Sequence, residues 1–308
     1  MDNSNIAPDK TFYNLEDALK TPEKCEVLDL HYKGLSEFPE EILKLPNLKS
    51  LILWNNKLKS IPESISQLKK LQKIELSGNL LKTLPAAIGD LENLEILIVS
   101  WNHLELIPEG FGRLKKLKRL SLNNNDITTI PDDICELPEL EELILSENKI
   151  KALPENIGNL PKIKKLRIPG NNLQKLPDSI CNLKQLVKLE AQENNLMELP
   201  ENIGNLSELI KFRLYKNLLT ELPESFCNLH KLEKLLLYEN ELTKLPECIG
   251  QLTNLSDVDL NMNELTEIPA TMNNLKSLNY LNLGKNGFSR EDMIKIQNML
   301  PDIHVTWS

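Results

Sequence analysis

Apolar residues recur along this chain with a period of 23 residues. From Leu48 it reads LKSLILWNNKLKSIPESISQLKK and then LQKIELSGNLLKTLPAAIGDLEN. The register holds without an insertion from Cys25 to Leu300, which gives twelve units of the pattern LxxLxLxxNxLxxLPxxIxxLxx. Self-similarity at one fixed period predicts a solenoid in which each unit buries its apolar side against the next.

The places within a unit predict its local structure. LxxLxLxx is typical of a short strand whose fourth and sixth places face inward and whose third, fifth and seventh places face outward. Eleven of the twelve units carry Asn at the ninth place and eleven carry Pro at the fifteenth. We expect the buried Asn to bond the backbone of neighbouring turns and Pro to start a short helical turn.

The two ends depart from the pattern, as the open ends of a stack require. Residues 11–21 predict a short amphipathic helix capped by Asn14, and FSREDMIKIQNMLP predicts a longer helix capped by Ser289. A strand is expected within residues 303–307. We therefore expect one domain, with an N-terminal helical cap (1–24), eleven repeats (25–277), and a degenerate last repeat with a C-terminal helical cap (278–308).

The LPxxIxxLxx half of each unit resembles the 23-residue subclass of leucine-rich repeats, which occurs in bacterial and in intracellular Ras-group-like proteins. The resemblance covers residues 25–300. It implies an α/β fold: a right-handed solenoid in the form of an arc or horseshoe. The concave side would hold a parallel sheet of about twelve short strands, and the convex side short helical or 3₁₀ turns. It also implies a protein-binding role without enzymatic activity.

Charge and motif content narrow the function classes. The net charge of −9 argues against a nonspecific nucleic-acid binder and against docking on an anionic membrane. No secretory signal or apolar membrane stretch is evident, so we expect a cytoplasmic protein. The four histidines lie in different units, no phosphate loop is present, and DVDLNMNE lacks the Gly and Glu of a calcium loop. No catalytic, cofactor or metal site is therefore expected.

Three cysteines define a second period of 46 residues. Cys135, Cys181 and Cys227 all occupy the nineteenth place, whereas Gly stands there in the units between them. Duplication of two-unit blocks would explain this alternation. Two turns of strand spacing would separate the cysteines by roughly 10 Å, beyond the reach of a disulfide. They are expected to be buried or half-buried free thiols in a reducing compartment.

Candidate binding residues lie at the outward places of the sheet, in two groups. The basic-aromatic stretch comprises Lys165, Arg167, Lys188, Lys211, Arg213, Tyr215, Lys234 and Tyr238. The apolar stretch comprises Ile52, Trp54, Ile96, Ile98, Trp101 and Ile144. Neighbouring lysines on a sheet repel one another. Keeping four of them in line, with Glu190 and Glu193 to offset only part of the repulsion, suggests a site for an acidic partner.

These groups predict a non-enzymatic scaffold or adaptor that binds a protein with an acidic segment on its concave face. An alternative is a polyanionic ligand, either single-stranded nucleic acid or an acidic glycan, with Tyr215 and Tyr238 as a stacking platform. The negative net charge makes nucleic acid the weaker choice. The basic side chains could also serve only to solubilise the face, and the apolar stretch could mediate self-association. The oligomeric state is left open.

Overall fold

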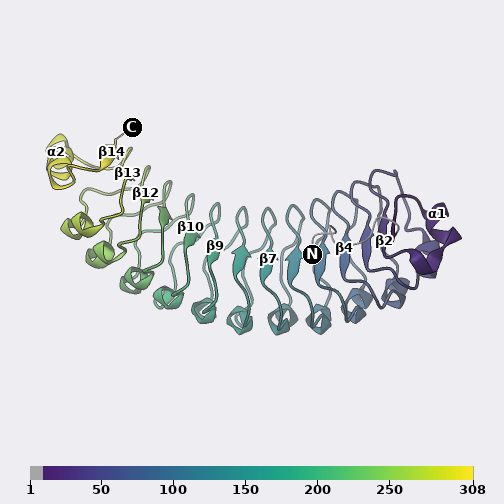
Figure 1. The fold of residues 1–308 in the computed structure, drawn as a ribbon. Helices are drawn as coiled ribbons and strands as arrows, with labels where there is room; N and C mark the ends of the chain where they lie inside the picture. The colour runs from purple at the N-terminus through teal and green to yellow at the C-terminus, as the bar shows by residue number, and fades with distance from the viewer. Residues whose placement is uncertain (1–9, 308) are drawn as a thin grey trace. The chain divides into compact units, whose positions relative to one another are not determined.

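The computed structural model describes residues 10–307 and divides into two compact units, residues 1–149 and 150–308. In each unit the strands lie on one side and the 3₁₀ turns on the other (Figure 1). The strands of the first unit are β1 (Thr11–Phe12), β2 (Val27–Asp29), β3 (Ser50–Ile52), β4 (Lys73–Glu75), β5 (Ile96–Ile98), β6 (Arg119–Ser121) and β7 (Glu142–Ile144). Those of the second are β8 (Lys165–Arg167), β9 (Lys188–Glu190), β10 (Lys211–Arg213), β11 (Lys234–Leu236), β12 (Asp257–Asp259), β13 (Tyr280–Asn282) and β14 (His304–Thr306).

Within each unit every strand pairs in parallel with the next one in the sequence. The pairing keeps equal places of the repeat side by side, so that Lys211 of β10 lies between Lys188 of β9 and Lys234 of β11. The fourth and sixth places point into the core, as Phe212 and Leu214 do with 1% and 0% exposure. The outward places therefore form columns along a surface that we call the strand face.

The side opposite the strands consists of 3₁₀ turns. Pro223 is extended (φ −67°, ψ 150°), and its carbonyl accepts a bond of 2.9 Å from the Phe226 N–H. Pro thus precedes the turn and does not occupy its first position, which corrects the expectation that it begins the helix. The turns are η3 (Pro22–Lys24), η4 (Glu40–Lys44), η5 (Glu63–Gln67), η6 (Ala86–Asp90), η7 (Phe111–Arg113), η8 (Asp132–Glu136), η9 (Ile157–Asn159), η10 (Asp178–Asn182), η11 (Ile203–Asn205), η12 (Glu224–Asn228), η13 (Glu247–Gln251) and η14 (Ala270–Asn274).

The ninth-place asparagines connect successive repeats through their side chains. Asn217, which is 5% exposed, accepts a bond of 3.0 Å from the Leu196 N–H of the preceding repeat. Its amide nitrogen donates to the Ala191 carbonyl at 3.1 Å and to the Leu214 carbonyl at 2.9 Å. The side chain thus satisfies backbone groups that the turn leaves inside the core. The structural role expected for this column is confirmed.

The eighth place of every repeat has a left-handed backbone conformation. Trp101 (φ 57°), Tyr32 (φ 52°) and Glu193 (φ 57°) adopt it, as do Gly78 and Gly170. This conformation turns the chain out of the strand and leaves the side chain at the strand's end in solvent. Trp101 and Tyr32 are 64% and 66% exposed there. Large aromatic residues are unfavourable in this region of backbone space, where Gly and Asn are preferred.

The ends of the stack are covered by helices and by extra strands. In α1 (Leu15–Lys20) the Asn14 side chain accepts from the Asp17 N–H, and in α2 (Arg290–Met299) Ser289 and Asp292 form a capping box. Both caps were predicted. Thr11–Phe12, however, forms strand β1 against β2 and is not helical, because the open edge of the first repeat's strand is completed by backbone pairing. At the other end β14 pairs with β13 as expected.

On the turn side, the nineteenth place of one repeat lies beside the seventeenth place of the next. A methyl group at Gly204 would collide with the Ser225 carbonyl oxygen, and one at Gly158 would collide with the Ser179 carbonyl oxygen. Gly is therefore required at the nineteenth place when the turn of the next repeat begins at its sixteenth place, as η10 and η12 do. After Cys181 the turn η11 begins only at Ile203, with Asn202 left outside it. The two packing arrangements thus alternate in the turns η9 to η12, whereas η13 begins at Glu247 although it follows Cys227.

The same proximity joins Cys227 to Cys248 in a disulfide, with their Cα atoms 5.8 Å apart. The expectation that Cys227 is a free thiol is therefore wrong. It compared only equal places of the repeat, whereas the bond joins unequal ones, 21 residues apart. Cys25, Cys135 and Cys181 are free and buried. Burial raises the pKa of the Cys135 thiol to about 12 and that of Cys181 to about 11.

Candidate binding surfaces

The basic-aromatic stretch occupies the strand face of β8 to β11. Its third-place column consists of Lys165, Lys188, Lys211 and Lys234, each paired in register with the next. All but Lys188 are exposed, and Lys188 is half-buried. The structure therefore places four like charges on neighbouring strands, as the repeat register predicted.

Glu190 lies at the centre of this stretch and contacts three of its cations. Its carboxylate is 2.7 Å from Arg213, 2.8 Å from Lys188 and 3.1 Å from Arg167. Glu190 itself is only 5% exposed. A buried carboxylate among three cations compensates more of the repulsion than we expected from the sequence. The third and fifth places of β8–β11 nevertheless hold six basic residues against this single acid.

Tyr215 and Tyr238 form a parallel stack in the seventh-place column beside the charges. Their ring centroids are 4.4 Å apart and the rings are inclined by 8°. Burial, followed by the neighbouring Tyr215, raises the pKa of the Tyr238 hydroxyl to about 12. A base cannot insert between rings at this distance, so the platform envisaged for nucleic acid is restricted to the outer ring faces.

The basic stretch ends at β12, where acidic residues take over the same columns. Asp257 is 3.3 Å from Lys234, and the Ser256 hydroxyl donates to it at 2.6 Å. The Ser256 hydrogen bond and, to a lesser extent, Lys234 lower the pKa of Asp257. Asp259 accepts from the Asn261 N–H, so both aspartates of DVDLNMNE take part in local hydrogen bonds. Residues 10–307 contain no group of three or more side chains suited to holding a metal ion.

The apolar stretch is less open than its sequence positions indicated. Ile52 and Ile144 are buried, with 7% and 6% exposure, and Ile96 and Ile98 are half-buried. Trp101, at the end of its strand, is the exposed member. Exposure in the apolar stretch is therefore concentrated at Trp101, and the role of the stretch as a binding surface stays a prediction.

An aromatic cluster at the start of the first unit escaped the sequence analysis. The rings of His31 and Trp54 stack in parallel with centroids 4.8 Å apart, and the Tyr32 ring meets Trp54 edge-on at 4.7 Å. His31 Nδ1 lies 2.6 Å from an Asp29 carboxylate oxygen. The signal was available, because His31 and Trp54 both occupy the seventh place and Tyr32 follows at the eighth.

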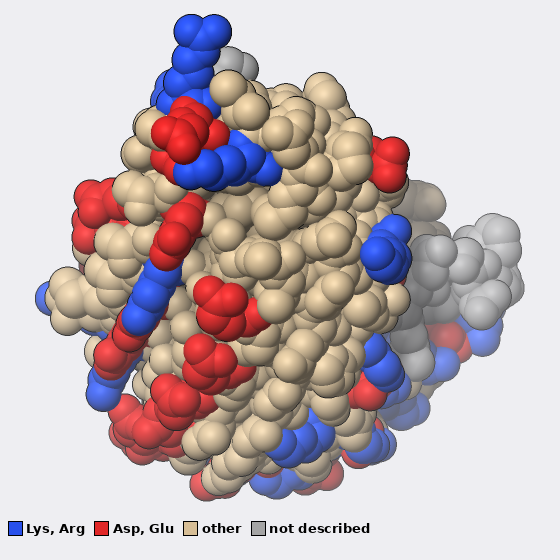
Figure 2. All heavy atoms as spheres, turned by 90° about the vertical axis from the view of Figure 1, so that its left-hand side faces the viewer, with Lys and Arg blue, Asp and Glu red and all other residues tan. Residues whose placement is uncertain are grey.

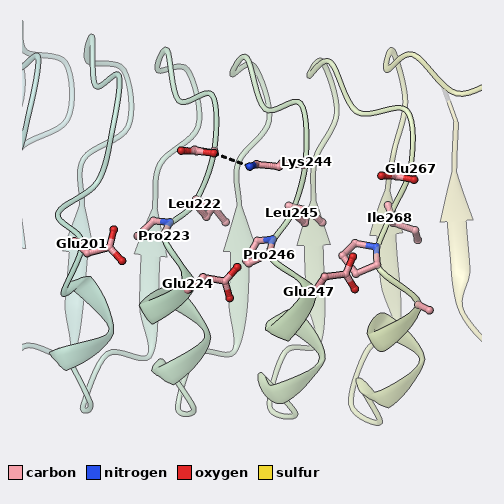
Figure 3. A pocket seen from close by; sticks show the side chains of 13 residues that line it. Glu201, Leu222, Pro223, Glu224, Lys244, Leu245, Pro246, Glu247, Glu267 and Ile268 are labelled. Atoms are coloured by element: carbon pink, nitrogen blue, oxygen red, sulfur yellow. Dashed lines mark ion pairs between the residues drawn. The ribbon is translucent and has the colours of Figure 1, made fainter.

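A second surface feature lies in the second unit, on the loops that lead from the strands into the 3₁₀ turns. A cavity of about 650 Å³ follows four successive repeats, with proline rings and carboxylates along it (Figure 3). Lys244, its one basic residue, pairs with Glu221 at 3.0 Å. The carboxylates belong to Glu201, Glu221, Glu224, Glu247 and Glu267. This acidic flank is distinct from the basic strand face of the same repeats.

Viewed from the side of the C-terminal elements, the surface is largely uncharged, and acidic and basic side chains alternate in one row (Figure 2). Ion pairs between neighbouring repeats are common in the second unit, as between Lys231 and Glu208 at 2.7 Å.

Within residues 10–307, no helix is both long enough and apolar enough to span a bilayer.

Comparison with solved structures identifies similar repeat proteins. The TDR receptor structure is 29% identical with a TM-score of 0.79, over 91% of this chain and 51% of that one. The PEPR1–AtPEP1 structure is 30% identical with a TM-score of 0.77, over 88% and 40%. The Arabidopsis receptor kinase HAESA, in complex with the peptide hormone IDA and the co-receptor SERK1, is 27% identical with a TM-score of 0.66, over 90% and 52%. The chain thus spans about half or less of these receptor chains.

No curated protein sequence matches the chain. Two family models do. The model described as "Leucine rich repeat" matches residues 46–104 and 105–150. The model described as "Leucine-rich repeat region" matches residues 132–217 and 201–301, more than half of the chain. Together with the repeating strand, Asn and 3₁₀ turn, these matches establish that the chain belongs to the leucine-rich-repeat family.

Proposed function

We propose that this protein is a non-enzymatic binding module that holds an acidic segment of a partner protein on its strand face, over β8 to β11. The observation that carries the proposal is that the third and fifth places of these strands hold six basic side chains and one acidic side chain. The Tyr215–Tyr238 stack beside them supplies aromatic surface of the kind enriched in binding hot spots.

Two further considerations support this function. Parallel strands in register keep the four lysines close together although the chain as a whole is negative, so the basic surface carries a cost in repulsion. Structures similar to this chain include receptors, and HAESA is seen with a peptide hormone. A polypeptide ligand is therefore the first choice for this chain also.

Charge reversal tests the proposal. The variant Lys188→Glu/Lys211→Glu should bind a fluorescent ten-residue Glu/Asp peptide at least tenfold more weakly than the parent chain, in a fluorescence anisotropy titration. The matched control is Lys151→Glu/Lys175→Glu, which changes the net charge equally at exposed positions of the same unit, off the strand face. Equal weakening in both variants would mean that only the overall charge matters, and the proposal would be lost.

Competition with other ligands and the salt dependence of the affinity distinguish polyanion binding from binding of an acidic peptide. A single-stranded oligonucleotide or an acidic glycan that outcompetes the peptide, with a steep loss of affinity as salt is raised, would favour it. A peptide contact anchored on Tyr215 and Tyr238 should depend less on salt and should weaken in Tyr215→Ala. A loss of affinity in Tyr215→Ala would therefore indicate a contact that is both aromatic and ionic, and an unchanged affinity would indicate purely electrostatic binding.

Cytoplasmic location remains a prediction. Disulfides such as Cys227–Cys248 occur mainly in proteins of oxidising compartments, which weighs against it. Trapping the thiols with an alkylating agent at the moment of cell lysis measures the state of this pair in its native compartment. Alkylation of both Cys227 and Cys248 would support a reducing compartment, and an intact disulfide between them would contradict a cytoplasmic location.

A further inference from the structure

The aromatic cluster of the first unit borders a small cavity on the strand face, which we call the Trp54 cavity. It measures about 330 Å³, at the lower end of the range for ligand pockets and suited to one side chain. Its lining residues are Asp29, Ile52, Trp54, Lys73, Glu75 and Ser77. They come from three successive repeats, so that one cavity unites the ends of β2, β3 and β4.

Trp54 is held in a fixed orientation beside this cavity. His31, one repeat earlier in the same column, stacks on it with an inclination of 4°, and Tyr32 packs against it edge-on. The next residue in the column is Ser77, which has no ring with which to continue the stack. The cavity lies at this interruption, between Trp54 and Ser77, so part of the indole ring is left for a ligand.

Two carboxylates stand beside the ring. Asp29 is positioned by His31, whose Nδ1 and backbone N–H lie 2.6 Å and 3.2 Å from the same carboxylate oxygen. Glu75 is positioned by the Ser77 N–H, which donates to it at 3.1 Å. Lys73, also in the lining, is the single basic residue against these two acids. An aromatic face with two oriented carboxylates is complementary to a planar cation.

We propose that the Trp54 cavity binds an arginine side chain of a partner polypeptide. The guanidinium group stacks on Trp54 and donates hydrogen bonds to Glu75 and Asp29. Arginine is favoured over lysine because its flat, weakly hydrated cation can both stack on an aromatic ring and bond carboxylates through its fork of N–H groups. The inference relies on the proposed protein-binding role only in taking a polypeptide as the ligand, and its charge preference is opposite to that of β8–β11.

The test uses the full chain and the peptide acetyl-Gly-Arg-Gly-Arg-Gly-amide, titrated by calorimetry. Replacing both arginines by citrulline, which is neutral and of the same shape, should abolish binding, and lysine should weaken it. Trp54→Ala should weaken binding by about tenfold, and Glu75→Gln should also weaken it. Lys73→Ala should strengthen binding, because a repelling charge is removed.

The matched control is Trp101→Ala, which removes an exposed tryptophan of the same unit outside the cavity. It should leave the affinity unchanged. Should Trp54→Ala prove unfolded by circular dichroism, Trp54→Leu keeps apolar bulk but removes the aromatic face. Equal binding of the citrulline peptide, or full affinity in the folded Trp54 variants, would overturn the inference. Lys188→Glu/Lys211→Glu should not affect this peptide, so failure here is distinguishable from failure at β8–β11.

Discussion

Cys227, at the nineteenth place of one repeat, is bonded to Cys248, at the seventeenth place of the next. The same two places bring Gly204 against Ser225 and Gly158 against Ser179. These turn-side contacts therefore connect unequal places of successive repeats, whereas the strand pairing connects equal ones. The disulfide is a covalent version of a contact that recurs along the solenoid.

This bond should contribute measurably to stability. It closes a segment of 21 residues, for which loop entropy predicts about 3 kcal/mol. Reduction should lower the free energy of unfolding of the parent chain by about this amount. The double variant Cys227→Ala/Cys248→Ala should show no response to reductant. Urea unfolding with and without dithiothreitol makes both comparisons.

A thiol count checks the pairing independently. The chain has five cysteines, of which three are free in the structure. The denatured chain should therefore yield three reactive thiols before reduction and five after it. Burial, which raises the pKa of Cys135, should also make the native chain react slowly with iodoacetamide. Five thiols without reduction would refute the bond in that preparation.

Removing one asparagine of the ninth-place column should strongly destabilise the stack. Asn217→Ala leaves the Leu196 N–H and two carbonyls without their partner inside the core. We expect a loss of about 3 kcal/mol, since each unsatisfied buried group costs about 1 kcal/mol or more. Asn195→Ala, at an exposed position, should be close to neutral. Similar urea midpoints for the two variants would contradict the role assigned to the column.

Glu190 should stabilise the second unit and at the same time weaken its affinity for anions. Glu190→Gln removes a carboxylate that contacts Arg167, Lys188 and Arg213, and should cost about 2 kcal/mol once solvent exposure of the cations is considered. The loss should shrink as salt screens the exposed repulsion. Affinity for the acidic peptide should rise. Glu193→Gln, an exposed carboxylate 3.2 Å from Lys216, is the matched control for both measurements.

The Tyr stack should make stability depend on pH in the alkaline range. The folded pKa of Tyr238 is about 12, above the ordinary value of 10, because burial and Tyr215 disfavour the phenolate. The folded state therefore holds this proton more tightly than the unfolded state. The resulting stabilisation is complete below pH 10 and is lost as the pH rises to about 12.

Tyrosinate absorbance provides the measurement. Subtracting the alkaline titration of Tyr238→Phe from that of the parent chain should reveal one tyrosine that ionises near pH 12. Tyr215→Phe should lower this pKa toward the ordinary value, since the Tyr215 hydroxyl is one of its causes. Ionisation of Tyr238 near pH 10 in both the parent chain and Tyr215→Phe would be inconsistent with the buried stack.

Sequence alone determined the repeat length, the inward places, the Asn column and the two helix caps. It could do so because the inward places and the caps depend on local sequence. The Asn column recurs at one place of every repeat, and its backbone partners recur with it. Residues 23 apart in the sequence lie side by side on neighbouring strands, so the repeat period alone predicts the columns of the strand face. The four-lysine column was predictable for this reason.

Tertiary structure decided the features that depend on how side chains of several repeats pack together. The Cys227–Cys248 bond depends on how far each turn advances before the next repeat begins, and this distance is not encoded in the period. Glu190 reaches cations on three strands because its side chain is buried among them. The Trp54 cavity exists because a ring stack stops at Ser77. The repeat pattern does not predict these three features, because each depends on the length and packing of several neighbouring side chains at once.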